Sequence, residues 1–178
     1  MTKLAGLCGA LRKDSTNLKL LREAARVFGA ESFTEGDLDL PLYNGDVEAA
    51  GMPEKVKALT ALIAQSDAVI IACPEYNKAL SGVMKNALDW ISRHDMGCLR
   101  DKPVAIMSAA AGRAGGERSQ FSLRLAITPF RPRLLAGPEL MIAESGKAFD
   151  DTGRLLSERS LKTLTELMDE LKREIARG

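Results

Sequence analysis

The apolar run at residues 68–73, Ala-Val-Ile-Ile-Ala-Cys, constrains the fold of this chain more than any other feature. A run this short, with polar residues on both sides, is typical of a strand that is buried on both faces of a parallel sheet. Pro74 must end that strand, because proline has no amide hydrogen to donate to a neighbouring strand. Residues 75–77 are therefore expected at the carboxyl edge of the sheet, where open α/β sheets bind ligands.

Strand-like and helix-like segments alternate along all 178 residues. Strands are predicted near residues 3–8, 32–40, 68–73 and 103–108, with a last strand pair near 134 and 141–143, and helical apolar spacing fills the intervals. This alternation favours a parallel sheet with right-handed crossovers. We expect one α/β domain, residues 1–178, with a five-stranded parallel sheet of order 2-1-3-4-5 and helices on both faces.

Composition excludes several classes of function. The formal net charge is +1, and no basic segment is interleaved with aromatic residues, so nucleic acid is not an expected partner. No apolar run approaches the roughly 20 residues that span a bilayer, and no charged leader with an apolar core opens the chain. We expect a cytoplasmic protein that binds neither membranes nor nucleic acid.

Cysteine and histidine usage argues against a metal site and against hydrolysis. The three cysteines, Cys8, Cys73 and Cys98, lack the paired spacing of a zinc site, so reduced thiols and no metal are predicted. A hydrolytic triad would depend entirely on His94, the only histidine, which lies at a predicted helix C-terminus where capping is commoner.

Residues 9–17, Gly-Ala-Leu-Arg-Lys-Asp-Ser-Thr-Asn, follow the first predicted strand and open the first helix. Free amides at the helix start, the Ser15 and Thr16 hydroxyls, the Asn17 amide and the Arg12 guanidinium can together surround a phosphate. The pattern is neither Gly-x-Gly-x-x-Gly nor a Walker loop, which disfavours a dinucleotide-binding Rossmann site and an NTPase. A turn with a helix cap at Ser15 or Asp14 explains the same residues about as well.

Two further loops, residues 75–77 and 108–116, also follow strands. In the predicted strand order, the first and third strands are neighbours and the connection reverses between them, so all three loops meet around one crevice. A planar cofactor that carries a phosphate suits such a crevice. Tyr76 is a candidate stacking surface for it, although a tyrosine is more often a half-buried packing residue.

The motif at residues 9–17, together with Pro-Glu-Tyr-Asn-x4-Gly-x2-Lys-Asn-Ala-x-Asp-Trp at residues 74–90, resembles those of the NAD(P)H-dependent FMN reductases. This flavodoxin-like family includes quinone, azo-dye and chromate reductases. The likeness spans nearly the whole chain. It departs at Ala10, where the family often has serine and where the missing hydroxyl is expected to weaken phosphate binding, and at Ala79 and Ser81, where serine and proline are frequent.

The resemblance implies which residues of each loop bind the cofactor, FMN. The phosphate and ribityl chain would be held by Arg12, Ser15, Asn17 and Leu18. The isoalloxazine ring would be lined by Pro74, Glu75, Tyr76 and Asn77. The other side would be closed by Ser108 and the loop to Gly116, including Gly112.

The chemistry implied by the resemblance is a ping-pong transfer. NADPH or NADH gives hydride to the flavin and leaves, and a small acceptor such as a quinone, free flavin, azo dye or metal oxyanion then takes the electrons. Because FMN performs the difficult step, no side chain need be a general acid or nucleophile, and no catalytic residue is predicted. The resemblance also implies a homodimer or homotetramer.

Two other functions use the same features. A flavodoxin-type electron carrier would bind FMN but serve protein partners; such carriers are usually strongly acidic, and the near-neutral charge argues against one. A flavin-containing redox sensor would require Cys8 and Cys73 to form a disulfide beside the flavin, whereas two inert buried cysteines are commoner.

Two features outside the loops carry further expectations. The segment from Arg113 to Arg133 holds five arginines and the single acid Glu117, so some of these arginines could meet the 2′-phosphate of NADPH or else form a solvated or oligomer-facing surface. Trp90, near the polar side of its predicted helix, is expected to be buried against a second subunit.

Overall fold

The computed structural model describes residues 2–178, which form a six-stranded parallel sheet. The strand order is β2-β1-β3-β6-β7, and β8 also pairs with β6. The bounds are β1 (Lys3–Cys8), β2 (Ser32–Gly36), β3 (Ala68–Ala72), β6 (Pro103–Ala109), β7 (Arg133–Leu134) and β8 (Leu140–Ile142). The predicted fold and order are confirmed, with one difference in strand count: two short strands, β7 and β8, share the fifth position beside β6.

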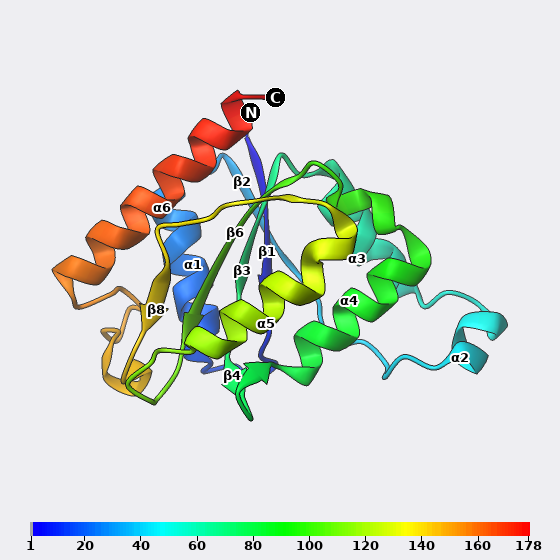
Figure 1. The fold of residues 1–178 in the computed structure, drawn as a ribbon, viewed down its shortest axis with the longest axis horizontal. Helices are drawn as coiled ribbons and strands as arrows, with labels where there is room; N and C mark the ends of the chain where they lie inside the picture. Colours follow the sequence, from blue (N-terminus) through cyan, green and yellow to red (C-terminus); the bar gives the residue numbers. More distant parts are fainter. Residues whose placement is uncertain (1) are drawn as a thin grey trace.

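Helices cover both faces of the sheet (Figure 1). One face carries α1 (Thr16–Phe28) and α6 (Glu158–Ala176), and the other carries α3 (Glu54–Gln65), α4 (Gly82–His94) and α5 (Glu117–Ile127). The other helical segments within residues 2–178 are short: α2 (Gly45–Ala50), η1 (Met96–Leu99), η2 (Thr128–Phe130) and η3 (Ser145–Lys147). Within residues 2–178, no helix has the length and apolar character needed to cross a membrane.

The central strand β3 is buried along its whole length, as its apolar run predicts. Its side chains alternate between the two faces because successive residues of a strand point in opposite directions. Ile70 packs with α1 and α6, whereas Val69 and Ile71 pack with α3, α4 and α5. Two hydrophobic clusters thus hold the sheet between its helices and fix the carboxyl ends of β1, β3 and β6 beside one another.

An extended segment, residues 37–53, carries α2 away from the sheet and covers part of α4 (Figure 1). The Trp90 indole nitrogen donates to the Pro41 carbonyl over 2.7 Å, and the Trp90 ring makes an edge contact with Tyr43 at 5.0 Å. Trp90 is therefore fully buried within its own chain. The expectation that a second subunit buries it was wrong, because the sequence pattern of α4 alone does not show which segment covers that helix.

Candidate functional site

Three loops and one turn line a cavity of about 240 Å³ at the carboxyl edge of the sheet. The loop after β1 contributes Ala10, Arg12 and the start of α1, and the segment after β3 contributes Pro74, Glu75 and Tyr76. Ala109 ends β6, residues 110 and 111 follow it, and Ser145 follows β8. The three loops meet as their positions after neighbouring strands predict.

The first loop and the start of α1 are bonded to the residues at the end of β6, where the third loop begins. Ser15 caps the helix, since its Oγ accepts from the Asn17 amide nitrogen at 3.2 Å. The Asn17 side chain is buried and bonds the backbone of Ala109 twice: Nδ2 donates to the carbonyl at 2.8 Å, and Oδ1 accepts from the amide at 3.0 Å. Asn17 thus ties two loops together, whereas the Arg12 side chain is exposed and makes no ion pair with any described residue.

The second loop is a small β-hairpin rather than an irregular loop. It pairs β4 (Glu75–Tyr76) with β5 (Ala79–Leu80) around a two-residue turn, Asn77 and Lys78, whose φ angles are 50° and 65°. The hairpin is fixed to α5 at two points: the Arg118 amide donates to Glu75 Oε2 at 3.0 Å, and the Leu80 amide donates to Ser122 Oγ at 2.6 Å. These contacts present Tyr76, 57% exposed, at the cavity.

The third loop is supported from below by Ser108. This serine is fully buried; its Oγ donates to the Gly115 carbonyl at 2.8 Å and accepts from Gln120 Nε2 at 2.9 Å. Gly115 has a φ of 61°, and a Cβ there would lie 2.7 Å from the Met141 backbone, so only glycine fits. Ser108 therefore shapes the loop from the interior, and Gly112 lies exposed on its outer side.

Most of the predicted cofactor residues line this cavity, namely Arg12, Ser15, Asn17, Pro74, Glu75 and Tyr76. Of the others, Leu18 faces the grooves beside α1, Asn77 lies in the hairpin turn, and Ser108 lies beneath the third loop. Sequence reasoning missed Ser145. The rule applied to the other strands, that functional residues follow the carboxyl ends of parallel strands, would have pointed to it after β8.

The cysteines do not support a disulfide switch. Cys8 pairs in register with Ala72 and packs on the face with α1 and α6, whereas Cys73 packs on the face with α3 and α4. Side chains on opposite faces of a sheet cannot meet the geometry of a disulfide. Burial also raises the pKa of the Cys73 thiol to about 11, which keeps it protonated and unreactive near neutral pH.

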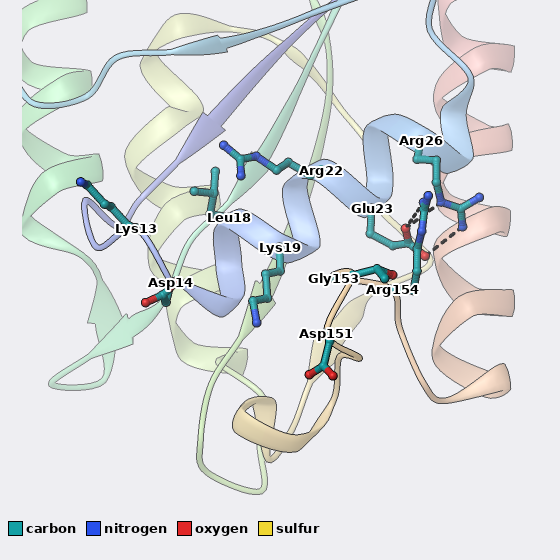
Figure 2. Close-up of a pocket in the computed structure, with 11 residues that line it drawn as sticks. Lys13, Asp14, Leu18, Lys19, Arg22, Glu23, Arg26, Asp151, Gly153 and Arg154 are labelled. Atoms are coloured by element: carbon teal, nitrogen blue, oxygen red, sulfur yellow. Dashed lines mark hydrogen bonds and ion pairs between the residues drawn. The ribbon is translucent and has the colours of Figure 1, made fainter.

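A second, larger groove of about 430 Å³ runs along α1 beside the turn at residues 150–154 (Figure 2). Its wall is built on Glu23, whose side chain is only 1% exposed and pairs with Arg26 at 2.8 Å and with Arg154 at 3.0 Å. The Glu23–Arg154 pair joins α1 to a turn 131 residues later in the chain. This ion pair thus anchors the segment that follows Ser145 to α1.

The strand order and the loops at the carboxyl edge define a flavodoxin-like protein. The solved flavoenzyme NAD(P)H:(acceptor) oxidoreductase FerB from Paracoccus denitrificans is similar with a TM-score of 0.89 and 30% identity, covering 99% of this chain and 98% of that one. The chain belongs to the NADPH-dependent FMN reductase family, which it matches over residues 2–147.

Two curated relatives match most of the chain. An NAD(P)H-dependent FMN reductase of Pseudomonas aeruginosa is 38% identical over 172 residues, covering 96% of this chain and 93% of the relative. A quinone reductase of Escherichia coli K12 is 35% identical over 164 residues, covering 89% of this chain and 87% of the relative. The predicted family is confirmed, and with it an oxidoreductase that uses FMN and NAD(P)H.

Proposed function

We propose that the cavity between the first and third loops holds the FMN phosphate and ribityl chain, with the isoalloxazine ring against the β4–β5 hairpin. The observation that carries this assignment is the convergence of the α1 N-terminus, the hairpin and the 109–111 segment on one cavity. An N-terminus with unpaired amide hydrogens and a nearby guanidinium suits a phosphate dianion. The hydroxyls of Ser15 and Thr16 lie at this N-terminus of α1 and line the same cavity.

Every predicted residue except Leu18 then has a definite task. Arg12, free of ion pairs with the described residues, closes over the phosphate, while Ser15 contacts it and caps α1. Asn17 acts through its two bonds to Ala109, which set the width of the cavity. Pro74, Glu75, Tyr76 and Asn77 line the ring, and the third loop, with Ser108 beneath it and Gly112 at its rim, closes the other side.

When bound, FMN supplies the redox chemistry, taking a hydride from NADPH or NADH and passing electrons to a small acceptor. The protein positions the ring and admits the two planar substrates in turn to the same exposed surface beside Tyr76, which is a ping-pong order. No side chain is assigned as a catalytic acid, base or nucleophile. A quinone is the acceptor class we propose first, with free flavin, azo dyes and metal oxyanions as others that an open site admits.

The first test is reduction without oxygen. The FMN-loaded protein is mixed with NADPH while the visible flavin absorbance is followed, and rapid bleaching is expected. Tight FMN binding without bleaching would favour an electron carrier, and no FMN binding would contradict the assignment of the cavity. Steady-state rates with NADPH and a quinone should then give parallel double-reciprocal lines; intersecting lines would contradict the ping-pong order.

We also propose a cytoplasmic homodimer or homotetramer built from one domain, residues 1–178. Its support is the exposed apolar surface of α5, where Phe121 is 51% and Leu125 is 77% exposed, one helical turn apart. α5 also contacts the hairpin that carries Tyr76. Sedimentation of the FMN-loaded protein should give the mass of a dimer or tetramer, and Leu125→Glu should shift the protein towards a smaller assembly. A wild-type protein that is monomeric at all concentrations would contradict the proposed oligomer.

A further inference from the structure

The cavity holds few side-chain donors for an anion. Ala10, Pro74 and the alanines at 109–111 contribute none, and both polar atoms of the Asn17 side chain are taken by Ala109. Besides Arg12, Ser15 and the phenol of Tyr76 on the hairpin, the side-chain donors that line the cavity are the hydroxyls of Thr16 and Ser145. They lie 3.1 Å apart, although 129 residues separate them in sequence, and Ser145 is 5% exposed.

These two hydroxyls share one hydrogen bond but carry two protons. Thr16 Oγ1 donates to Ser145 Oγ, so the Ser145 proton is left without an acceptor among residues 2–178. Reversing the direction of the bond leaves the Thr16 proton instead, so the pair always offers one unused donor. A buried hydroxyl that lines a cavity is more stable when its proton has an acceptor, and an anionic oxygen is the strongest acceptor available to it.

The position of Ser145 is fixed by its backbone. The Ser145 amide donates to the Ala110 carbonyl at 3.1 Å, which attaches the turn to the third loop, and the Ala148 amide donates to the Ser145 carbonyl at 3.3 Å. The Glu23–Arg154 pair anchors the following turn to α1 (Figure 2). Ser145 is thus held against the start of α1 from both sides rather than placed there by a free loop.

We propose that Ser145 donates a hydrogen bond to the FMN phosphate and that Thr16 is a positioning residue, which orients the Ser145 hydroxyl by donating to it. This inference rests on the proposed FMN site and adds a residue outside the loop at residues 9–17 to the proposed phosphate-binding group. The phosphate would then contact groups from two segments far apart in the sequence, the start of α1 and the turn after β8, which the protein already holds together.

The test is equilibrium binding of FMN and of riboflavin, which lacks the phosphate, followed by flavin fluorescence. Ser145→Ala should weaken FMN binding by about tenfold or more, since a hydrogen bond to a charged group is lost, and leave riboflavin binding unchanged. Ser145→Cys, which keeps the side-chain size but donates weakly, should show the same loss. Thr16→Val should show a smaller loss, and the double variant Thr16→Val/Ser145→Ala should match Ser145→Ala alone.

Thr152→Val is the matched control, because it removes a hydroxyl from the next turn, where Thr152 bonds Asp150 outside the cavity. It should bind both ligands like the wild type. Unchanged FMN binding by both Ser145 variants would overturn this inference while leaving the FMN site standing. Equal weakening of FMN and riboflavin, or a larger loss in Thr16→Val than in Ser145→Ala, would also overturn it. Failure of the wild type to bind FMN would overturn both proposals.

Discussion

The hydroxyl of Ser81 donates to the carbonyl of Gly9 over 2.6 Å, across 72 residues of sequence. Ser81 is fully buried, and its Oγ also accepts from the Met84 amide at 3.2 Å, which caps the N-terminus of α4. The approach requires glycine, because a Cβ at Gly9 would lie 2.9 Å from both Ser81 Oγ and Cys73 Sγ. One hydroxyl thus joins the first loop to the helix that follows the hairpin.

Ser81→Ala is expected to destabilise the protein more than the loss of a helix cap alone. A lost cap costs about 1 kcal/mol, and an unpaired buried carbonyl adds about 1–3 kcal/mol. Ser157→Ala is the matched control, since Ser157 caps α6 at the same distance, 3.2 Å, but is exposed. Urea unfolding should show a loss of about 2–4 kcal/mol for Ser81→Ala and about 1 kcal/mol for the control; equal losses would show that the Gly9 bond contributes nothing.

Lys78→Gly is expected to stabilise the protein. Lys78 has a φ of 65°, in the left-handed region where a side chain costs about 1–2 kcal/mol, and it lies at the exposed tip of the hairpin. Relief of that strain, less the greater freedom of glycine in the unfolded chain, should raise the free energy of unfolding by roughly 0.5–1 kcal/mol. Lys78→Ala removes the same charge but keeps the strain, so it should stay near the wild type. A loss of stability in Lys78→Gly would contradict this account.

The buried thiol of Cys73 makes stability fall at alkaline pH. Burial raises its pKa from 9.0 to about 11, so the folded protein keeps a proton that the unfolded chain releases between these values. Its stabilising contribution is full below pH 9 and declines as pH rises towards 11, by up to about 3 kcal/mol. Unfolding measured at pH 8, 9 and 10 should show this decline in the wild type and a shallower one in Cys73→Ala. Identical slopes would exclude Cys73 as the cause.

The sequence predicts the parts of this protein that depend on local pattern. The apolar run at residues 68–73 indicates a doubly buried strand, and the alternation of elements then leaves few possible sheet orders. Loops after neighbouring strands were correctly expected to meet. The hairpin at residues 75–80 escaped prediction because two-residue strands are too short to show a period of two, and their pairing depends on support from α5.

The remaining differences come from contacts between segments distant in sequence. Trp90 lies on a helix face that the pattern marks as half polar, and its burial depends on residues 41–43, which no periodicity links to α4. Asn17 is chemically suited to bind phosphate, yet its amide is used by Ala109, 92 residues away. A residue type restricts what a side chain can bind, but its partner follows only from tertiary packing.

The preference for NADPH over NADH is expected to depend on Arg113 and Arg118. In the arginine-rich segment, Arg124 bonds the Leu135 carbonyl and Arg133 pairs with Glu174, so these two already serve the fold. Arg113 lies in the third loop and Arg118 in the first turn of α5; both side chains are exposed and form no ion pair with any residue in the range 2–178. They are thus free to meet the 2′-phosphate that distinguishes NADPH.

Replacing both Arg113 and Arg118 by alanine should lower kcat/KM for NADPH roughly tenfold, since each exposed ion pair contributes up to about 1 kcal/mol, and should leave kcat/KM for NADH nearly unchanged. The contribution should shrink as salt is added, because exposed charges are screened. Arg131→Ala is the control: it removes the same charge beyond the end of α5, where the Arg131 backbone bonds Asp101. If the NADPH/NADH ratio stayed at its wild-type value in the double variant, these arginines would instead belong to a solvated or subunit-facing surface.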